Sequence, residues 1–397
     1  MKKIFLILLL GVVLRIAAVY IYDNIGKDYY WEYGSIAKNL IHDRGYSLFY
    51  FYNGEIENTF RENVQPYPSA YMLPGYVYFL LPFMYIHDVV LRNILLLLIH
   101  ISLSLLTIYL LYLLTKKYFS ERTALLTALF VAVLPEFIYS TISFTPTILY
   151  QFLVVVIFLF LTGNMKRNKI IFFTGFLIAA TVYLRSEFML FWLLLTGVFL
   201  ISKKIRHAVI IFSTVIILIL PWSIRNIAVF KEPVLFTTSF GLNLYRGNNP
   251  LGVGVWGSDS LFEEINHIKG NDFEITYNKM YMDASLDYIK NNPIKVMGSS
   301  FVKLFYTLFY YPNDPRSRNP LYFIPAAFLS LIFIISLFLT FSWDKFKYFY
   351  VFIFSSITIA VVFSPLPRYI AMMKIFFLPF AAYGLIYLWD RFLKSPD

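Results

Sequence analysis

Apolar runs of about 20 residues recur along this chain, and this pattern constrains the fold more than any other feature of the sequence. Such a run crosses the hydrocarbon core of a bilayer as a helix, because lipid forces every backbone polar group to bond within the segment. Only 14% of the residues are charged, against about 25% in a typical soluble domain. The sequence therefore predicts an all-α polytopic membrane protein.

The net charge of +11 does not indicate binding to nucleic acid. Most Lys and Arg residues fall in short loops between the apolar runs, where they act as topology signals. The sequence holds no cysteine, so disulfides and thiolate chemistry are excluded. The first run, Lys2 to Tyr22, lacks a small-residue cleavage site, so we expect a retained first span rather than a signal peptide.

Basic clusters orient the chain, because loops rich in Lys and Arg stay in the cytoplasm. Four basic clusters lie at 116–122, 166–169, 203–206 and 345–347. These clusters and both termini share the cytoplasmic side only if the apolar runs 68–86 and 294–312 do not cross the membrane. About ten spans remain, at 4–22, 91–115, 122–142, 147–163, 169–184, 187–202, 207–226, 320–341, 348–364 and 370–388. We expect one domain, 1–397, with outer segments at 23–90 and 227–319.

The first outer segment contains one amphipathic pattern, which predicts a helix from Tyr30 to Arg44 lying at the membrane interface. Asp28 precedes this helix and Glu32 lies in its first turn. One interpretation is structural: Asp28 caps the helix and Glu32 faces the positive end of its dipole. The other is a general base that takes a proton from an acceptor hydroxyl at the membrane surface. The two interpretations are compatible.

A series of motifs in this segment resembles the first outer loop of the GT-C superfamily of glycosyltransferases. The order is Asp28, Tyr-Gly-Ser-Ile-Ala-Lys-Asn-Leu (33–40), Arg-Gly-Tyr-Ser (44–47) and Pro-Ser-Ala-Tyr-Met-Leu-Pro-Gly-Tyr (68–76). The branch that it resembles holds the protein O-mannosyltransferases and the lipid A aminoarabinose transferase. The resemblance implies the GT-C fold, juxtamembrane helices in this loop, and Asp28 as catalytic base. Asp28 lies five residues before Tyr33, where four is commoner, so Glu32 is a rival base.

Two further motifs match the same family in order and composition. Leu-Pro-Trp-Ser-Ile-Arg-Asn (220–226) closes the seventh span, and Gly-Leu-Asn-Leu-Tyr-Arg-Gly-Asn-Asn-Pro (241–250) follows. A lipid-phosphate donor leaves as a phosphate monoester, whose charge needs cations near the headgroup plane. The candidate cations are Arg225, Arg246, Arg368 and Lys303. The resemblance implies substrate-binding roles for Tyr71, Tyr76, Asn226, Tyr245, Asn248, Asn249 and Tyr369.

Arg15, Arg185 and Glu136 lie within or at the end of predicted spans, where ionisable groups are costly. We interpret Arg15 as structural. Arg185, followed by Ser and Glu187, resembles a family Arg-Pro-Glu turn. Glu136 is either a protonated, hydrogen-bonded carboxyl or a group that faces the site.

No cofactor or metal is predicted. Many relatives carry an acidic residue where this chain has Thr145-Pro146-Thr147, and the five histidines show no metal-ligand spacing. No Gly-rich phosphate loop is present, so a nucleotide-sugar donor is unsupported.

These features together predict an inverting glycosyltransferase in a bacterial-type plasma membrane, with both termini cytoplasmic and the active site on the other side. The expected partners are a polyprenyl-phosphate sugar, a hydroxyl acceptor on a protein, lipid or glycan, and the bilayer. Two alternatives are a transporter or flippase of lipid-linked glycans, and an O-antigen ligase or polymerase.

Overall fold

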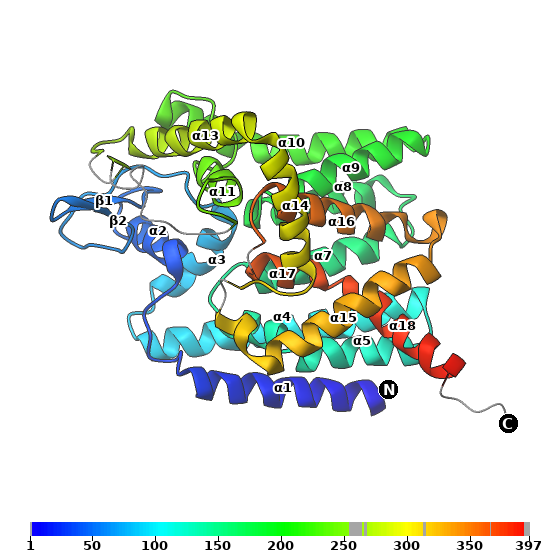
Figure 1. Ribbon diagram of the computed structural model, residues 1–397. Helices are drawn as coiled ribbons and strands as arrows, with labels where there is room; N and C mark the ends of the chain where they lie inside the picture. Colours follow the sequence, from blue (N-terminus) through cyan, green and yellow to red (C-terminus); the bar gives the residue numbers. More distant parts are fainter. Residues whose placement is uncertain (1, 254–263, 266–267, 313–314, 366, 393–397) are drawn as a thin grey trace.

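The structure, a computed structural model, describes residues 2–253, 264–265, 268–312, 315–365 and 367–392, and only the backbone of residues 315–316 and 367–370. Almost all of its secondary structure is helical. Figure 1 shows a bundle of long helices, with short helices and a small sheet gathered at one end and both chain termini at the other. The predicted all-α polytopic membrane architecture is confirmed.

Five helices in the described part of the chain are long and apolar enough to cross a membrane. They are α1 (Lys2–Tyr22), α4 (Val89–Tyr118), α10 (Ile205–Phe230), α15 (Pro320–Leu339) and α16 (Trp343–Val362). A sixth candidate is the pair α5 (Glu121–Val133) and α6 (Pro135–Ile142), bent by 54°. Three shorter apolar helices are α7 (Thr147–Leu161), α8 (Asn168–Leu184) and α9 (Phe188–Ile201).

The last expected span is divided into α17 (Pro367–Lys374) and α18 (Phe377–Phe392). Each of the ten expected spans therefore coincides with a helix or a pair of helices. Since length and composition qualify five or six of the described helices as spans, the count of ten stays a prediction.

Phenylalanine rings pack closely against one another in the interior of the bundle. The rings of Phe158 and Phe376 lie 4.1 Å apart, and those of Phe333 and Phe377 stack at 4.0 Å. Other large apolar side chains point outward, including Phe5 and Phe338, which are 66% and 80% exposed. Helices that are apolar on every side suit a lipid environment, where the outward face needs no water.

The two runs expected not to cross form α3 (Pro74–Met84) and α14 (Pro293–Leu308). With 11 residues, α3 extends only about 16 Å, roughly half the thickness of a bilayer core. It packs against α2 (Trp31–Ile41) and α8. Figure 1 shows α14 running across the direction of the long helices, in contact with α16. Both helices suit an interfacial position.

The same end of the bundle holds α2, the hairpin of β1 (Tyr50–Tyr52) and β2 (Glu55–Glu57), α11 (Phe240–Gly247) and α13 (Phe273–Asn291). The hairpin turns at Asn53-Gly54, both with positive φ, which is the preferred pair for a two-residue turn. The outer segments 23–90 and 227–319 thus meet at one end, as Figure 1 shows.

Helix α2 is shorter than the predicted helix from Tyr30 to Arg44. Its apolar stripe is buried as expected, with Tyr33, Ile36 and Ala37 in the core. The helix ends at Ile41, three residues before the predicted end at Arg44. It ends there because Asp43 takes a left-handed conformation. The hypothesis that Asp28 caps α2 is wrong, since the N-cap position is Tyr30 and its side chain makes no capping bond.

Arg15 has the structural role expected of it, and the break at Pro135 explains why. Proline has no N–H to donate to the carbonyl of Val131, so the α5–α6 bend leaves carbonyl groups without helical partners. Arg15 donates hydrogen bonds to the carbonyls of Val131 and Ala132 at 3.2 and 3.1 Å and to Ser104 Oγ at 2.9 Å. The buried guanidinium therefore replaces the missing helix donors.

We expect Arg15→Met to lower the free energy of unfolding by about 3 kcal/mol, because buried carbonyls lose charge-assisted hydrogen bonds. Thermal unfolding in detergent measures the loss. Leu9→Ala, which changes an outward-facing residue of the same helix (51% exposed), is the control and should change stability far less. Equal effects of the two substitutions would contradict the role given to Arg15.

Candidate active site

A cavity of about 180 Å³ lies at the end of the bundle that holds the short helices. It is lined by residues drawn from α2, α11, α16, the segment before α3, the turn between α6 and α7, and the turn between α8 and α9. Both outer segments therefore contribute to one cavity, as a site shared between them requires.

Four of the described residues that line this cavity are charged: Glu32, Arg185, Glu187 and Arg246. Arg185 and Glu187 flank the turn between α8 and α9, with Nη1 and Oε1 3.9 Å apart. Arg246 is only 4% exposed and donates from Nη1 to Asn243 Oδ1, one turn earlier on α11, at 3.3 Å. Two carboxylates and two guanidinium groups thus line one cavity, which suits proton transfer beside a bound anion.

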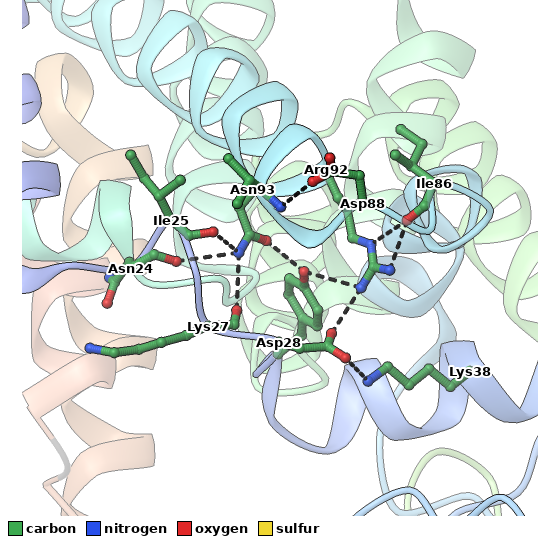
Figure 2. Close-up of polar contacts among 11 residues, drawn as sticks. Asn24, Ile25, Lys27, Asp28, Lys38, Ile86, Asp88, Arg92 and Asn93 are labelled. Carbon is green, nitrogen blue, oxygen red and sulfur yellow. Dashed lines mark hydrogen bonds and ion pairs between the residues drawn. The ribbon is translucent and has the colours of Figure 1, made fainter.

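Asp28 lies outside this lining, in the network of ion pairs that Figure 2 shows. Lys38 Nζ donates to Asp28 Oδ2 at 2.6 Å and Arg92 Nη1 donates to Oδ1 at 2.8 Å. Each carboxylate oxygen therefore already accepts from a cation. Glu32, four residues later, lines the cavity. The two candidate bases consequently occupy different settings.

Asn93 holds the chain that leads to Asp28, as Figure 2 shows. Its amide nitrogen lies within hydrogen-bond distance of the carbonyls of Asn24, Ile25 and Lys27, at 3.3, 2.8 and 3.0 Å. The hydroxyl of Tyr30 donates to Asn93 Oδ1 at 2.5 Å. One residue at the start of α4 therefore fixes the whole approach to α2.

Arg225 and Asn226 bind backbone at the same end of the protein. Arg225 donates to the carbonyls of Ser69 and Tyr46, at 2.7 and 2.9 Å, and to Asn226 Oδ1. It lines a separate apolar groove with Tyr78 and other residues of α3, α7, α8 and α10. The structure therefore does not bring Arg225 onto the cavity lining that includes Arg246.

The Gly-Asn-Asn sequence after α11 packs against the end of α16. A Cβ atom at Gly247 would lie only 1.7 Å from the carbonyl oxygen of Phe363, so only glycine fits there. Asn248 donates to the carbonyl of Val362 and accepts from Lys303 Nζ at 3.0 Å. Burial lowers the pKa of Lys303 to about 8. These contacts give the motif and Lys303 a role in docking α11.

The remaining predicted substrate residues are divided between the cavity and the core. Tyr71 lines the cavity, while Tyr76 is fully buried with its hydroxyl 3.4 Å from His100 Nε2. Asn249 donates to the carbonyl of Tyr245, whose ring packs on Tyr281. Arg368 and Tyr369 are also predicted site residues, and their side chains lie outside the described part of the chain.

Part of the sequence matches a known protein family, and the fold matches solved structures. Residues 67–224 match the family model of the dolichyl-phosphate-mannose-protein mannosyltransferases. The archaeal oligosaccharyltransferase AglB from Archaeoglobus fulgidus, in complex with an inhibitory peptide and a dolichol-phosphate, superposes with a TM-score of 0.58 over 98% of this chain at 15% identity. The chain has the GT-C fold.

Other solved structures of the same archaeal enzyme give similar values. Its apo form has a TM-score of 0.58 at 15% identity over 98% of this chain, and its complex with Zn and sulfate has 0.57 at 16% over 98%. The chain spans about half the length of these proteins, 50% and 49%. No curated protein matches the sequence. The predicted resemblance to the GT-C superfamily is confirmed.

The range that matches the family model contains much of the cavity wall. It includes Tyr71, Thr145, Arg185 and Glu187, whereas Glu32 and the 241–250 motif lie outside it. Arg185 and Glu187 have a sequence signal, since two charges follow directly on a predicted span. Arg92 and Lys38, the partners of Asp28, are not singled out, because each is a single cation near the end of a predicted span or helix.

Glu136 pairs with Lys374 of α17, with Oε1 and Nζ 3.5 Å apart and both side chains nearly buried. This pair joins α6 to α17 and lines a small space together with Tyr306 and Ser317. Among the described residues, no group of three His, Asp or Glu side chains is arranged to hold a metal ion.

Glu274 on α13 is a buried carboxyl that the sequence does not single out. Its Oε2 accepts from the amide of Ala70 at 2.8 Å and from Thr238 Oγ1 at 2.6 Å, so it joins the two outer segments. Burial raises the pKa of Glu274 to about 7, against hydrogen bonds from these partners and the attraction of Arg225, which lower it.

This pKa predicts a pH-dependent stability. Because the folded carboxyl holds its proton more tightly than the unfolded one, its contribution is complete below pH 4.5 and is lost as the pH rises through about 7. The shift corresponds to about 3 kcal/mol. Melting temperatures between pH 5 and 8 should fall for the wild type, and Glu274→Gln should flatten this slope. If Glu274→Gln kept the wild-type slope of melting temperature against pH, the raised pKa of Glu274 would be contradicted.

Proposed function

We propose that this protein is an inverting glycosyltransferase that moves a sugar from a polyprenyl-phosphate carrier to a hydroxyl acceptor. The observation that carries the proposal is the cavity in which Glu32, Arg185, Glu187 and Arg246 meet at one end of an apolar helical bundle. A carboxylate suits the removal of a proton and a guanidinium group suits the binding of a phosphate. Transfer of a sugar from a lipid phosphate needs both.

Glu32 is the proposed base. It takes the proton of the acceptor hydroxyl while that oxygen bonds to the anomeric carbon, and the bond from this carbon to the phosphate oxygen breaks with its electron pair. Attack from the face opposite the phosphate inverts the anomeric centre. Asp28 then has a positioning role, since Arg92 and Lys38 occupy both of its carboxylate oxygens.

Arg246 and Arg185 are the proposed phosphate-binding cations. Negative charge grows on the leaving phosphate as its bond to the sugar breaks, and fixed guanidinium groups stabilise that charge. Arg246 is nearly buried, so its field is less screened by water than that of an exposed arginine. Arg225 and Lys303 have structural roles in this proposal because of their contacts, and Arg368 stays a candidate from the sequence.

A lipid carrier is favoured by what adjoins the cavity. Arg185, Glu187 and Ile359 also line a neighbouring apolar space, together with Phe188, Phe191, Phe352 and other residues. A phosphate held at Arg185 would therefore place its hydrocarbon chain against phenylalanine side chains. A soluble nucleotide sugar has no group that fits such a wall.

We place the site on the non-cytoplasmic face of a bacterial-type plasma membrane. The support is the charge pattern, since the basic clusters lie in loops away from the short helices and Figure 1 places both termini at the opposite end. The proposed acceptor is a hydroxyl group on a protein, a lipid or a glycan, and the assay below distinguishes these three classes.

Incubating purified protein with a panel of polyprenyl-phosphate sugars and candidate acceptors tests the proposal. We expect release of polyprenyl phosphate together with a product that is one sugar heavier. A product many sugars heavier would indicate a ligase or polymerase. Movement of the intact donor across a vesicle membrane without transfer would indicate a flippase and overturn the proposal.

A further inference from the structure

Trp31 begins α2 with a backbone conformation that its side chain disfavours. Its φ is +56°, in the left-handed region that bulky residues rarely occupy. A residue held in such a conformation needs surroundings that leave it no alternative, and such residues cluster at functional sites. The start of a helix alone therefore does not explain the backbone conformation of Trp31.

The chain is fixed on both sides of Trp31. Before it, Asn93 and Arg92 hold residues 24–28, as Figure 2 shows, and the buried Tyr30 is anchored through its hydroxyl. After it, α2 packs against α3. Gly34 allows this entry, because a Cβ atom there would lie 2.7 Å from Cβ of Tyr30. The strain at Trp31 is thus imposed by the contacts around it.

This strained backbone places an aromatic side chain at the cavity. Trp31 lines the cavity next to Glu32, and 39% of its surface is exposed. The ring of Tyr29 lies 5.1 Å from it at an angle of 53°. Trp31 therefore contributes an aromatic ring to the cavity wall beside the proposed base, and the ring of Tyr29 packs against it.

We propose that Trp31, supported by Tyr29, is a stacking platform for the pyranose or furanose ring of the transferred sugar. The inference rests on the proposed function. The C–H bonds on one face of a sugar ring are weakly positive and are attracted to the negative face of an indole. Trp31 is thus a specificity-determining residue that orients the anomeric carbon toward an acceptor held at Glu32.

This role can be tested by kinetic measurements with the lipid-linked sugar and by inhibition with polyprenyl phosphate alone. For Trp31→Ala, we expect the KM for the lipid-linked sugar to rise roughly tenfold, the usual size of an aromatic contact. Polyprenyl phosphate without a sugar should inhibit the variant and the wild type equally. Trp31→Phe keeps a ring and should fall between them. An interfacial anchor would instead weaken the binding of both lipids together, which would overturn the proposal.

Two controls separate this role from folding and from membrane anchoring. Trp31→Gly suits a positive φ, so it should melt higher than Trp31→Ala while showing the same rise in KM. Trp389→Ala removes a 55% exposed tryptophan of α18, remote from the cavity lining, and should leave the KM unchanged. If the wild type transfers no sugar, the proposed function fails; if it transfers and Trp31→Ala matches it, only the platform fails.

Discussion

Glu32→Gln is expected to lower kcat for sugar transfer by about 10³-fold, the usual contribution of a general base. The amide keeps the size of the side chain and cannot accept the proton of the acceptor hydroxyl. Because the substitution lies on the cavity wall and leaves α2 packed, donor binding should change little. Transfer rates and donor affinity measured on the same preparation separate the two effects.

Asp28→Asn is the matched comparison, since it makes the same chemical change four residues away. The exposed fraction of the Asp28 side chain is 41%, and it pairs with Lys38 and Arg92. We expect a loss of stability of about 1 kcal/mol and a fall in kcat of tenfold or less, through disorder at the start of α2. A larger loss for Asp28→Asn than for Glu32→Gln would assign the base to Asp28, as the family resemblance implies.

Arg246→Met is expected to lower kcat by about 10²-fold to 10³-fold, because the cation that stabilises the leaving phosphate is gone. Methionine retains much of the hydrophobic length of arginine, so the packing of α11 is largely kept. The variant should also bind polyprenyl phosphate more weakly. Single-turnover rates and product inhibition constants measure these two losses.

Arg225→Met provides the contrast to Arg246→Met. Arg225 bonds to the carbonyls of Ser69 and Tyr46 and lies on a different groove, so its loss should mainly reduce stability. If Arg225→Met instead removed the response to polyprenyl phosphate and Arg246→Met did not, the cation assignment would have to be reversed.

The broad architecture could be predicted because lipid imposes simple rules on sequence. Apolar length gave the positions of the helices, and the basic clusters led to the inference that 68–86 does not cross, which matches the short helix α3. Local detail could not be predicted in the same way. The early end of α2 depends on Asp43 adopting a left-handed conformation, which the apolar stripe does not record.

The family motifs in the outer segments single out Glu32 and Arg246, and the resemblance to an Arg-Pro-Glu turn singles out Arg185 and Glu187. All four line the cavity. The contacts that Asp28, Lys303 and Asn248 make with Lys38, Arg92, Val361 and Val362 join residues that lie 10 to 114 positions apart. Sequence spacing cannot reveal such contacts, because they arise from the packing of helices.

The backbone strain at Trp31 illustrates the same limit of sequence patterns. An interfacial helix rich in aromatic residues predicts that Trp31 lies near the headgroups. Nothing in that pattern indicates a positive φ, which follows from Asn93, Tyr30 and Gly34 acting together.

The most direct test of a lipid-linked donor is the stoichiometry of the reaction. Purified protein supplied with a labelled polyprenyl-phosphate sugar and an acceptor should release one polyprenyl phosphate for each sugar that appears on the acceptor, with the anomeric configuration inverted. Sugar transfer without released polyprenyl phosphate, or retention of the anomeric configuration, would contradict the account.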